Sequence, residues 1–390
     1  EDEHELCIGC AGGIDVQVTL PLVRSAALPG TERRSLSIRG LKGGHSGLDI
    51  NLGRANAIKV LTRLLVRARK HHVVDLVDFT AGSARNAIPR EARATVSLPA
   101  VDLPAFEATV REEFNRIKAE FATTEPDIDC EIVEAPHSPS TVIDSEVSTR
   151  LISFLQGCPN GVLRMSSQLP GVVETSSNLA MVKTLTSAEI FFLVRSDKAS
   201  ARDDVCETIC ALAQLAGAEA TCVGGYPGWA PKAASPVVDL LREAHQQVYG
   251  SLPDTKAVHA GLECGIIGSI YPELDMVSCG PTIQFPHSPD EKLHIPSVER
   301  FWRVLVKALE LARQAGASPA VPALEAFCSN VVQRPTFLTA HLLEKAAELE
   351  TSVGLTNIVR PWQNEWRRQE SLRALAASAG RQLASQLRMD

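Results

Sequence analysis

The sequence predicts an α/β protein whose central part, about residues 34–223, is an α+β domain with helices and a mostly antiparallel sheet. Three observations indicate this fold class. Segments in which apolar and polar residues alternate, as in half-buried strands, are interleaved with segments whose apolar residues recur at helical spacing. Two pairs of predicted strands follow one another without a helix between them, which is typical of antiparallel neighbours. Beyond residue 223, short apolar strands and helices alternate with loops rich in Gly and Pro.

The first half of the chain gives its strand and helix signals in a clear order. We expect strands at 13–23, 33–41, 72–79, 92–98 and 128–134, and helices at 51–70 and 102–121. The helix at 51–70 has apolar residues at helical spacing, and Asp49 or Asn51 is its expected N-cap. Asp102 is expected to cap the second helix, where Pro104 lies in the first turn and its missing N–H costs little.

The second half continues with alternating elements and ends in a different composition. We expect helices at about 144–157, 202–216, 235–249 and 297–315, and strands at 171–183, at 188–196, before Val223 and at 275–278. Residues 314–323 have the composition of a linker. Residues 324–390 are rich in Ala, Leu, Glu and Arg and are expected to form two or three helices of unknown role.

Length and composition exclude several functional classes. A chain of 390 residues can bury a sizeable core, and fractions of 45% hydrophobic and 22% charged residues are ordinary for a soluble globular protein. The net charge of −7 and the lack of a basic run argue against nucleic acid as a partner. No apolar stretch is long enough to span a membrane, and the acidic first five residues do not resemble a signal peptide. Because the chain starts without Met, we expect it to be processed or a fragment.

The ten cysteines are scattered through a chain without secretory features. This distribution favours reduced thiols in a cytosol-like compartment over a disulfide framework. Cys7 and Cys10 form a C-x-x-C pair, but no second such pair completes the four ligands of a structural zinc site.

Four polar loops contain the residue types from which catalytic and metal sites are built: GGHSG (43–47), RNAIPRE (85–91), HAGLECG (259–265) and GPTIQFPHSPDEKLHI (280–295). The first lacks the Lys-Ser/Thr ending of a phosphate-binding loop and the Gly-x-Ser-x-Gly spacing of a serine nucleophile elbow. In the last, His287 is close in sequence to Asp290, Glu291 and His294, and a neutral imidazole is a good zinc ligand. This chemistry favours a metal hydrolase, although a lone loop histidine is more often a surface or turn residue.

Further stretches join these loops in a recognisable series: GCAGGIDV (9–16), LKGGHSGLDINLGRANA (41–57), RNAIPREA (85–92), GVVETSSN (171–178), GGYPGWAP (224–231), HAGLECG (259–265) and DMVSCGPTIQFPHSPDEKLHI (275–295). Together they resemble the aminoacyl-histidine dipeptidases, also called Xaa-His or cytosolic non-specific dipeptidases. These belong to the aminoacylase/carnosinase-like di-zinc metallopeptidases. The resemblance follows the family's order from residue 1 to about 315, and nothing after about residue 320 matches.

The resemblance implies a role for each of seven residues. His287 matches the family's last metal ligand, and His45 matches a lid histidine that stabilises the oxyanion. Asn86 and Arg195 match the amide and guanidinium that hold the substrate, and His259, Gly261 and Glu263 match a loop that lines the substrate pocket. Structural alternatives remain open: a helix-entry residue for His45, a salt bridge for Arg195, a turn hydrogen bond for Asn86, and passive pocket walls for His259 and Glu263.

The resemblance also implies a domain organisation and a cofactor. Residues 1–33 would be a remnant of an α/β catalytic domain, and residues 34–223 a lid of the dimerisation type inserted in it. Residues 224–315 would complete the catalytic domain, followed by a linker and helical tail at 316–390. The implied activity is zinc-dependent hydrolysis of dipeptides in the cytoplasm, with two zinc ions in the intact family and a homodimer as an arrangement to be tested.

The sequence departs from the family in its metal ligands. The family's His-x-Asp pair, bridging Asp, Glu-Glu pair and further Asp all precede GCAGG, so His287 is the only one of five ligands found here, and the general-base Glu is missing. A catalytic zinc needs about three protein ligands. We therefore expect this chain to be N-terminally truncated, to bind zinc poorly and to be inactive on its own. The alternative is a non-catalytic binding or assembly protein built from the lid and the helical tail.

Overall fold

The computed structural model describes residues 2–136, 141–167, 169–232, 234–284 and 291–314, together with residues 360, 363, 364 and 367. The chain divides into two compact units. The sheet unit consists of residues 7–234 and 255–278, and the helical unit consists of residues 1–6, 235–254 and the chain from Cys279 onward. Within the described residues, no helix is both long and apolar enough to cross a membrane.

The sheet unit is built on one antiparallel sheet of nine strands. In order across the sheet the strands are β14 (Glu219–Tyr226), β2 (Gly12–Pro21), β13 (Ser187–Ser196), β12 (Val173–Thr184), β6 (Asp75–Ala81), β8 (Ala92–Pro99), β4 (Thr31–Arg39) and β9 (Asp129–Glu134), and β11 (Gly161–Met165) pairs with β12. The predicted mixed fold of helices with a mostly antiparallel sheet is confirmed.

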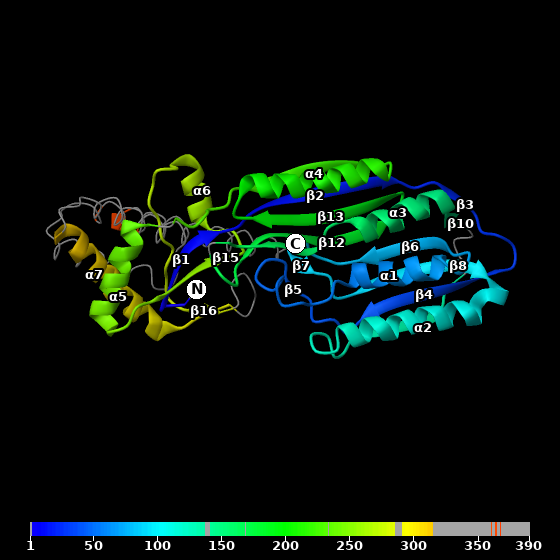
Figure 1. Cartoon of the computed structure of the whole chain (residues 1–390), viewed down its shortest axis with the longest axis horizontal. Coiled ribbons are helices and arrows are strands. Elements are labelled where there is room, and N and C mark those ends of the chain that lie inside the picture. Colours follow the sequence, from blue (N-terminus) through cyan, green and yellow to red (C-terminus); the bar gives the residue numbers. More distant parts are fainter. Residues whose placement is uncertain are drawn as a thin grey trace, which may run out of the picture. The chain divides into compact units, whose positions relative to one another are not determined.

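Four helices cover one face of this sheet (Figure 1). They are α1 (Ala57–Arg69), α2 (Leu103–Glu120), α3 (Ser145–Gly157) and α4 (Ala199–Leu215). Alternate strand residues, such as Leu36 and Ile38 on β4 and Phe192 and Val194 on β13, pack under the helices in a single buried core. The intervening residues form a second face that is rich in polar side chains, among them Arg195.

The sheet unit contains the same βαββαβ pattern twice. Half A consists of β4, α1, β6, β8, α2 and β9, and its strands are ordered β6-β8-β4-β9. Half B consists of β2, α3, β12, β13, α4 and β14, and its strands are ordered β12-β13-β2-β14, which is the same order. Half A is thus inserted between the first strand and the first helix of half B. The family resemblance groups β2 with the catalytic remnant at residues 1–33, and in the structure β2 is a central strand of this sheet.

The two halves meet where β6 pairs with β12. Ala81 lies opposite Val182, and the Thr184 hydroxyl accepts a hydrogen bond from the Phe79 amide at 2.7 Å. Gly82 follows β6 with φ +71°, and a Cβ atom there would lie 1.9 Å from the Ala180 carbonyl oxygen. The junction therefore requires glycine at this position, both for its backbone conformation and for its lack of a side chain.

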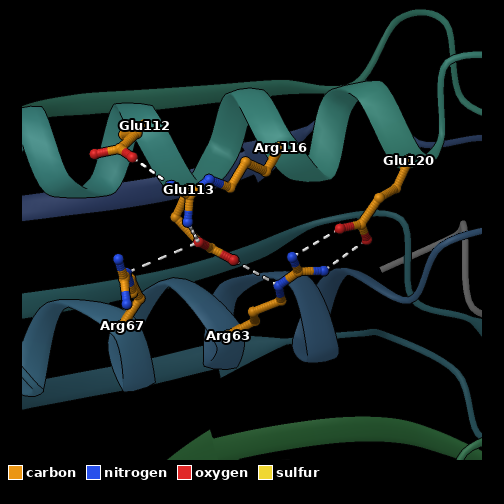
Figure 2. Close-up of polar contacts among 6 residues, drawn as sticks. All are labelled: Arg63, Arg67, Glu112, Glu113, Arg116 and Glu120. Atoms are coloured by element: carbon orange, nitrogen blue, oxygen red, sulfur yellow. Dashed lines mark hydrogen bonds and ion pairs between the residues drawn. The ribbon is translucent and has the colours of Figure 1, made fainter.

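Helices α1 and α2 are joined by a network of ion pairs on the outside of half A (Figure 2). Arg63 donates from Nε to Glu113 at 2.7 Å, and from its two terminal nitrogens to both oxygens of Glu120 at 2.6 and 2.8 Å. Arg116 and Arg67 approach the second oxygen of Glu113 at 3.4 and 4.0 Å. The Glu113 side chain is only 8% exposed, so it is the buried centre of the network.

The six helices predicted before residue 316 are confirmed, but the first begins at Ala57 and not at about residue 51, and its expected cap is wrong. α1 begins at Ala57, and Asn56 is its N-cap, with the side-chain oxygen accepting from the Ile58 amide at 2.9 Å. Asp49 instead belongs to the preceding turn, where it accepts from the His45 amide at 2.8 Å. Asp102 precedes α2 without a capping hydrogen bond from its side chain.

The helical unit contains α5 (Pro236–Tyr249), α7 (Ile295–Gln314) and a short hairpin of β16 (Ile283–Gln284) and β17 (Lys292–Leu293). Helices α5 and α7 pack together, and Tyr249 on α5 donates to the Arg300 carbonyl on α7 at 2.8 Å. The strand expected at 275–278 is wrong, because only Ser278 forms an isolated bridge there, with Cys7 in the sheet unit. The predicted tail helices at 324–390 lie outside the described residues, apart from the four single positions given above.

Candidate functional site

The GGHSG loop holds the His45 ring in one tautomer. His45 ends the short strand β5 (Gly44–His45), which pairs with β7 (Ala87–Ile88). Its Nδ1 atom accepts hydrogen bonds from the backbone amides of Gly47 at 3.2 Å and Leu48 at 3.0 Å. A nitrogen that accepts must be unprotonated, so the neutral imidazole carries its proton on Nε2. The Nε2–H group is therefore the hydrogen-bond donor that this ring can offer to a ligand.

The glycines of this loop are required by close contacts. A Cβ atom at Gly47 would lie 2.0 Å from the His259 carbonyl oxygen, and one at Gly44 would lie 2.2 Å from Nη1 of Arg54. Gly44 also has φ +131°, which L side chains rarely adopt. The absence of a side chain at Gly47 lets the loop that carries His45 lie directly against the HAGLECG loop, and its absence at Gly44 leaves room for Arg54.

Arg195, at the end of β13, is a buried cation that among the described residues has no carboxylate in hydrogen-bond contact, although Asp15 acts on it through space. Its side chain donates from Nη1 to the Tyr226 hydroxyl at 2.6 Å and from Nη2 to the Ser46 hydroxyl at 3.5 Å, and the residue is only 4% exposed. Its Nε has no hydrogen-bond partner within the described part of the chain. Burial lowers the pKa of the guanidinium, which nevertheless stays charged at neutral pH.

Tyr226 is seated between two glycine motifs. A Cβ atom at Gly13 would lie 2.5 Å from the Tyr226 hydroxyl, and one at Gly261 would lie 2.8 Å from Cε2 of the same ring. The glycines of GCAGG and HAGLECG thus leave space for the aromatic ring whose hydroxyl contacts Arg195. Contact with the Tyr226 ring therefore explains why Gly13 and Gly261 have no side chain.

His259 is a buried, neutral histidine beside this cation. Its Nε2 lies 2.7 Å from the Ser176 hydroxyl on β12, and the residue is 7% exposed. Burial, and then the charge of Arg195, lower the pKa of His259 to about 3.

Asn178, which like Ser176 lies on β12, supports the strand pair that carries His45. Its side-chain amide donates to the Ala87 carbonyl on β7 at 2.8 Å, so half B holds this strand pair in place.

The structure brings four of the predicted site residues together in the sheet unit: His45, Arg195, His259 and Gly261. Asn86 joins them through its backbone, because its carbonyl accepts from the Ser46 amide at 2.8 Å, while the residue itself is exposed. Glu263 is exposed at the first position of α6 (Glu263–Ile270). His287 lies outside the described residues.

Four polar residues of this cluster were not predicted from the sequence: Ser46, Ser176, Asn178 and Tyr226. Each lies inside a quoted motif, so the motifs contained the signal, but side-chain type alone did not separate them from ordinary strand and turn residues. Over the residues that the structure describes, no three His, Cys, Asp or Glu side chains are grouped so that they could hold a metal ion.

Comparison with known proteins places this arrangement among peptidases. Residues 36–125, most of half A, match the family model of the M20-type peptidase dimerisation domain. The cytosol non-specific dipeptidase of Escherichia coli (strain K12) is 42% identical over 311 residues, which cover 80% of this chain and 64% of that protein. The crystal structure of aminoacylhistidine dipeptidase from Vibrio alginolyticus matches 79% of this chain and 63% of its own chain, with 42% identity and a TM-score of 0.75. The chain thus spans a little under two thirds of both relatives.

Proposed function

The chain is related over four-fifths of its length to the aminoacylhistidine and cytosol non-specific dipeptidases, and from this relationship we propose that it forms part of a zinc-dependent dipeptidase of the cytoplasm that cleaves Xaa-His substrates. In this proposal the described residues supply the lid and one wall of the substrate pocket. The chemistry of each group in the cluster supports a separate role.

The observation that carries the proposal is the buried Arg195. Arg195 is only 4% exposed, and its Nε has no hydrogen-bond partner in the described structure. The Asp15 carboxylate acts on it through space but is itself paired with Arg85, so the guanidinium lacks a directly bonded anion of the kind that normally compensates a buried charge. A dipeptide carboxylate would supply that anion and accept two parallel N–H bonds from the planar fork. We therefore assign Arg195 to binding of the substrate's terminal carboxylate, with Tyr226 holding the guanidinium in place.

His45 is assigned to the scissile carbonyl. When water attacks an amide, negative charge develops on the carbonyl oxygen, and a preorganised donor lowers the energy of that state. Because two backbone amides donate to Nδ1, the neutral ring has its proton on Nε2. The ring can therefore donate from Nε2 without first moving a proton between its two nitrogens. His259, Gly261, Asn86 and Glu263 are assigned to the pocket lining, with His259 acting as a neutral hydrogen-bonding group.

Zinc would polarise the carbonyl and lower the pKa of the attacking water. Within the described residues no side chains are grouped to hold the ion, and His287, the residue that resembles a ligand, lies outside them. One imidazole falls short of the about three ligands that catalytic zinc requires. We therefore expect the 390-residue chain assayed alone with zinc not to hydrolyse an Xaa-His dipeptide.

A second candidate is a binding protein without catalysis, because the unpaired Nε of Arg195 can attract a carboxylate with or without a metal. The two candidates differ in product formation. Release of free histidine from Ala-His by the chain supplemented with zinc would overturn the expected inactivity and exclude a purely binding role.

Calorimetric titration of the chain with Ala-His and with its C-terminal amide tests the assignment of Arg195. A hydrogen bond to a charged group contributes about 1.5–3 kcal/mol, so the acid should bind about 10–100-fold more tightly than the amide. Arg195→Gln should remove this preference. Arg111→Gln is the control, because Arg111 is 59% exposed and pairs with Glu107 on α2, away from this cluster. Equal affinity of the original chain for acid and amide would refute the carboxylate role.

A homodimer is part of the proposal, supported by the match to a dimerisation domain. In the described sheet β6 of half A is already paired with β12 of the same chain, and β9 and β14 end the sheet. A second copy would therefore have to use one of these end strands or a helix face. Light scattering on the purified chain measures the mass: twice the monomer mass supports the dimer, and the monomer mass contradicts it.

A further inference from the structure

Half B contains a group of three thiols away from the candidate site. Cys206 and Cys210 lie one turn apart on α4, and Cys222 lies on the end strand β14. The thiol of Cys222 interacts electrostatically with the thiols of both helix cysteines, and helix α4 packs against strand β14. All three are free cysteines.

The backbone explains why these thiols meet. Helix α4 ends at Leu215 and the chain reverses into β14 at Glu219, so helix and strand run antiparallel and pack together. Three residues along the strand, from Glu219 to Cys222, cover about 10 Å. About 10 Å back along the helix from Leu215 is about seven residues, since the helix rises 1.5 Å per residue. That point lies near residue 208, between Cys206 and Cys210. Ala220 packs against the core beneath α4, and Cys222, two residues on, points to the same face.

The three thiols differ in their access to solvent. Cys222 is exposed, Cys210 is partly exposed and Cys206 is buried. Burial raises the pKa of Cys206 to about 12 and also raises the pKa of Cys210. Because the thiolate is the reactive form, a buried thiol with a raised pKa reacts slowly, and a soluble oxidant meets Cys222 first.

We propose that Cys222 is an oxidation site for peroxides and that Cys210 captures the oxidised sulfur as a disulfide between β14 and α4. In the first step the Cys222 sulfur attacks the O–O bond of hydrogen peroxide, giving sulfenic acid and one water. In the second step the Cys210 sulfur attacks that sulfur, the S–S bond forms, and the hydroxyl leaves as a second water. Two thiols are oxidised and one peroxide is reduced. The site lies four residues before Tyr226 on the same strand.

A second thiol group serves as an internal control. Cys264 interacts electrostatically with Cys10 and Cys7, and burial raises its pKa to about 11. It is partly exposed like Cys210, but it lies on α6, whereas Cys210 lies on α4, which packs against the strand that carries Cys222. If accessibility alone governed oxidation, Cys264 and Cys210 would respond alike. If contact with Cys222 governs it, only Cys210 responds.

The test is differential alkylation of the reduced 390-residue chain after treatment with hydrogen peroxide, followed by cleavage after glutamate and mass spectrometry. Glu189, Glu207, Glu219 and Glu243 place the three thiols of half B in separate peptides, 190–207, 208–219 and 220–243. The expected result is a cross-link of 208–219 to 220–243, two hydrogens lighter than the separate peptides, in a chain of monomer mass. Cys264 should remain open to alkylation.

Variants separate the two steps. Cys222→Ser should abolish the cross-link, and Cys264→Ser should leave it unchanged. Cys210→Ser should leave a sulfenic acid on Cys222 that dimedone traps, which identifies the first step without the second. A cross-link from Cys206, a disulfide between two chains, or a Cys222 that stays fully alkylatable at peroxide doses that oxidise Cys264 would each overturn the proposal. Circular dichroism of each variant confirms that it is folded before it is compared.

Discussion

Replacing Glu113 by Ala is expected to destabilise the sheet unit far more than the same change at its neighbour Glu112. Glu113 accepts from Arg63 at 2.7 Å and from Arg116 at 3.4 Å, and its side chain is 8% exposed (Figure 2). Glu112 is 64% exposed and pairs with Arg116, one turn along the same helix. Both changes put Ala at an interior position of α2, so their effects on helix propensity nearly cancel.

The expected loss in the free energy of unfolding follows from the solvent exposure of the two arginines that Glu113 binds. Breaking a buried ion pair from one side costs about 3–5 kcal/mol when the remaining charge is trapped without water. Here Arg63 and Arg116 are 36% and 51% exposed, so their guanidinium groups regain water, and Arg63 also keeps both bonds to Glu120. The loss should therefore be near that of charged hydrogen bonds, about 1.5–3 kcal/mol. For Glu112 an exposed pair one turn apart on a helix contributes about 0.3–0.5 kcal/mol.

Urea unfolding followed by circular dichroism measures both losses, because the free energy of unfolding falls linearly with denaturant concentration. Repeating the measurement at about 1 M salt should remove the Glu112 effect and leave most of the Glu113 effect, since buried pairs are screened less. Equal losses for the two variants, or a Glu113→Ala loss below about 0.5 kcal/mol, would show that burial of this carboxylate does not govern its contribution.

Two further predictions concern the junction between the halves and the buried histidine. Gly82→Ala should lower the free energy of unfolding by at least about 3 kcal/mol, because the new Cβ would clash with the Ala180 carbonyl and the residue would have an unfavourable φ. The control Gly161→Ala, with φ +90° and open space around it, should lower it by about 1–2 kcal/mol. Similar losses for the two variants in urea unfolding would show that the clash with Ala180 does not matter. His259 has a pKa of about 3 in the folded chain against an ordinary value of 6.5, so the unfolded chain binds the extra proton between these values. Its contribution to stability is therefore constant above about pH 7 and should fall, by up to about 1.4 kcal/mol per pH unit, as the pH drops from about 6.5 towards 3. A pH–stability curve of His259→Gln that runs parallel to that of the original chain would refute this assignment.

Local sequence determined the helices well. Helices α2 and α3 begin and end within a few residues of the expected limits, because their apolar spacing and first-turn residues are properties of consecutive positions. The cap of α1 could not be chosen in the same way. Asn56 is favoured because its side chain also donates to the Leu179 carbonyl at 2.8 Å, a contact more than a hundred residues away.

The sequence by itself also determined the relationship to dipeptidases and pointed to the candidate site, since GGHSG and HAGLECG are continuous motifs. Only the tertiary structure decided the strand order, in which β2 pairs with β13 about 170 residues later, and the repetition of one βαββαβ pattern around the β6–β12 junction. Likewise only folding placed Tyr226 between Gly13 and Gly261 and against Arg195. Capping and apolar periodicity act between near neighbours in the chain, whereas strand pairing and the burial of a cation depend on residues that become neighbours only when the sheet forms.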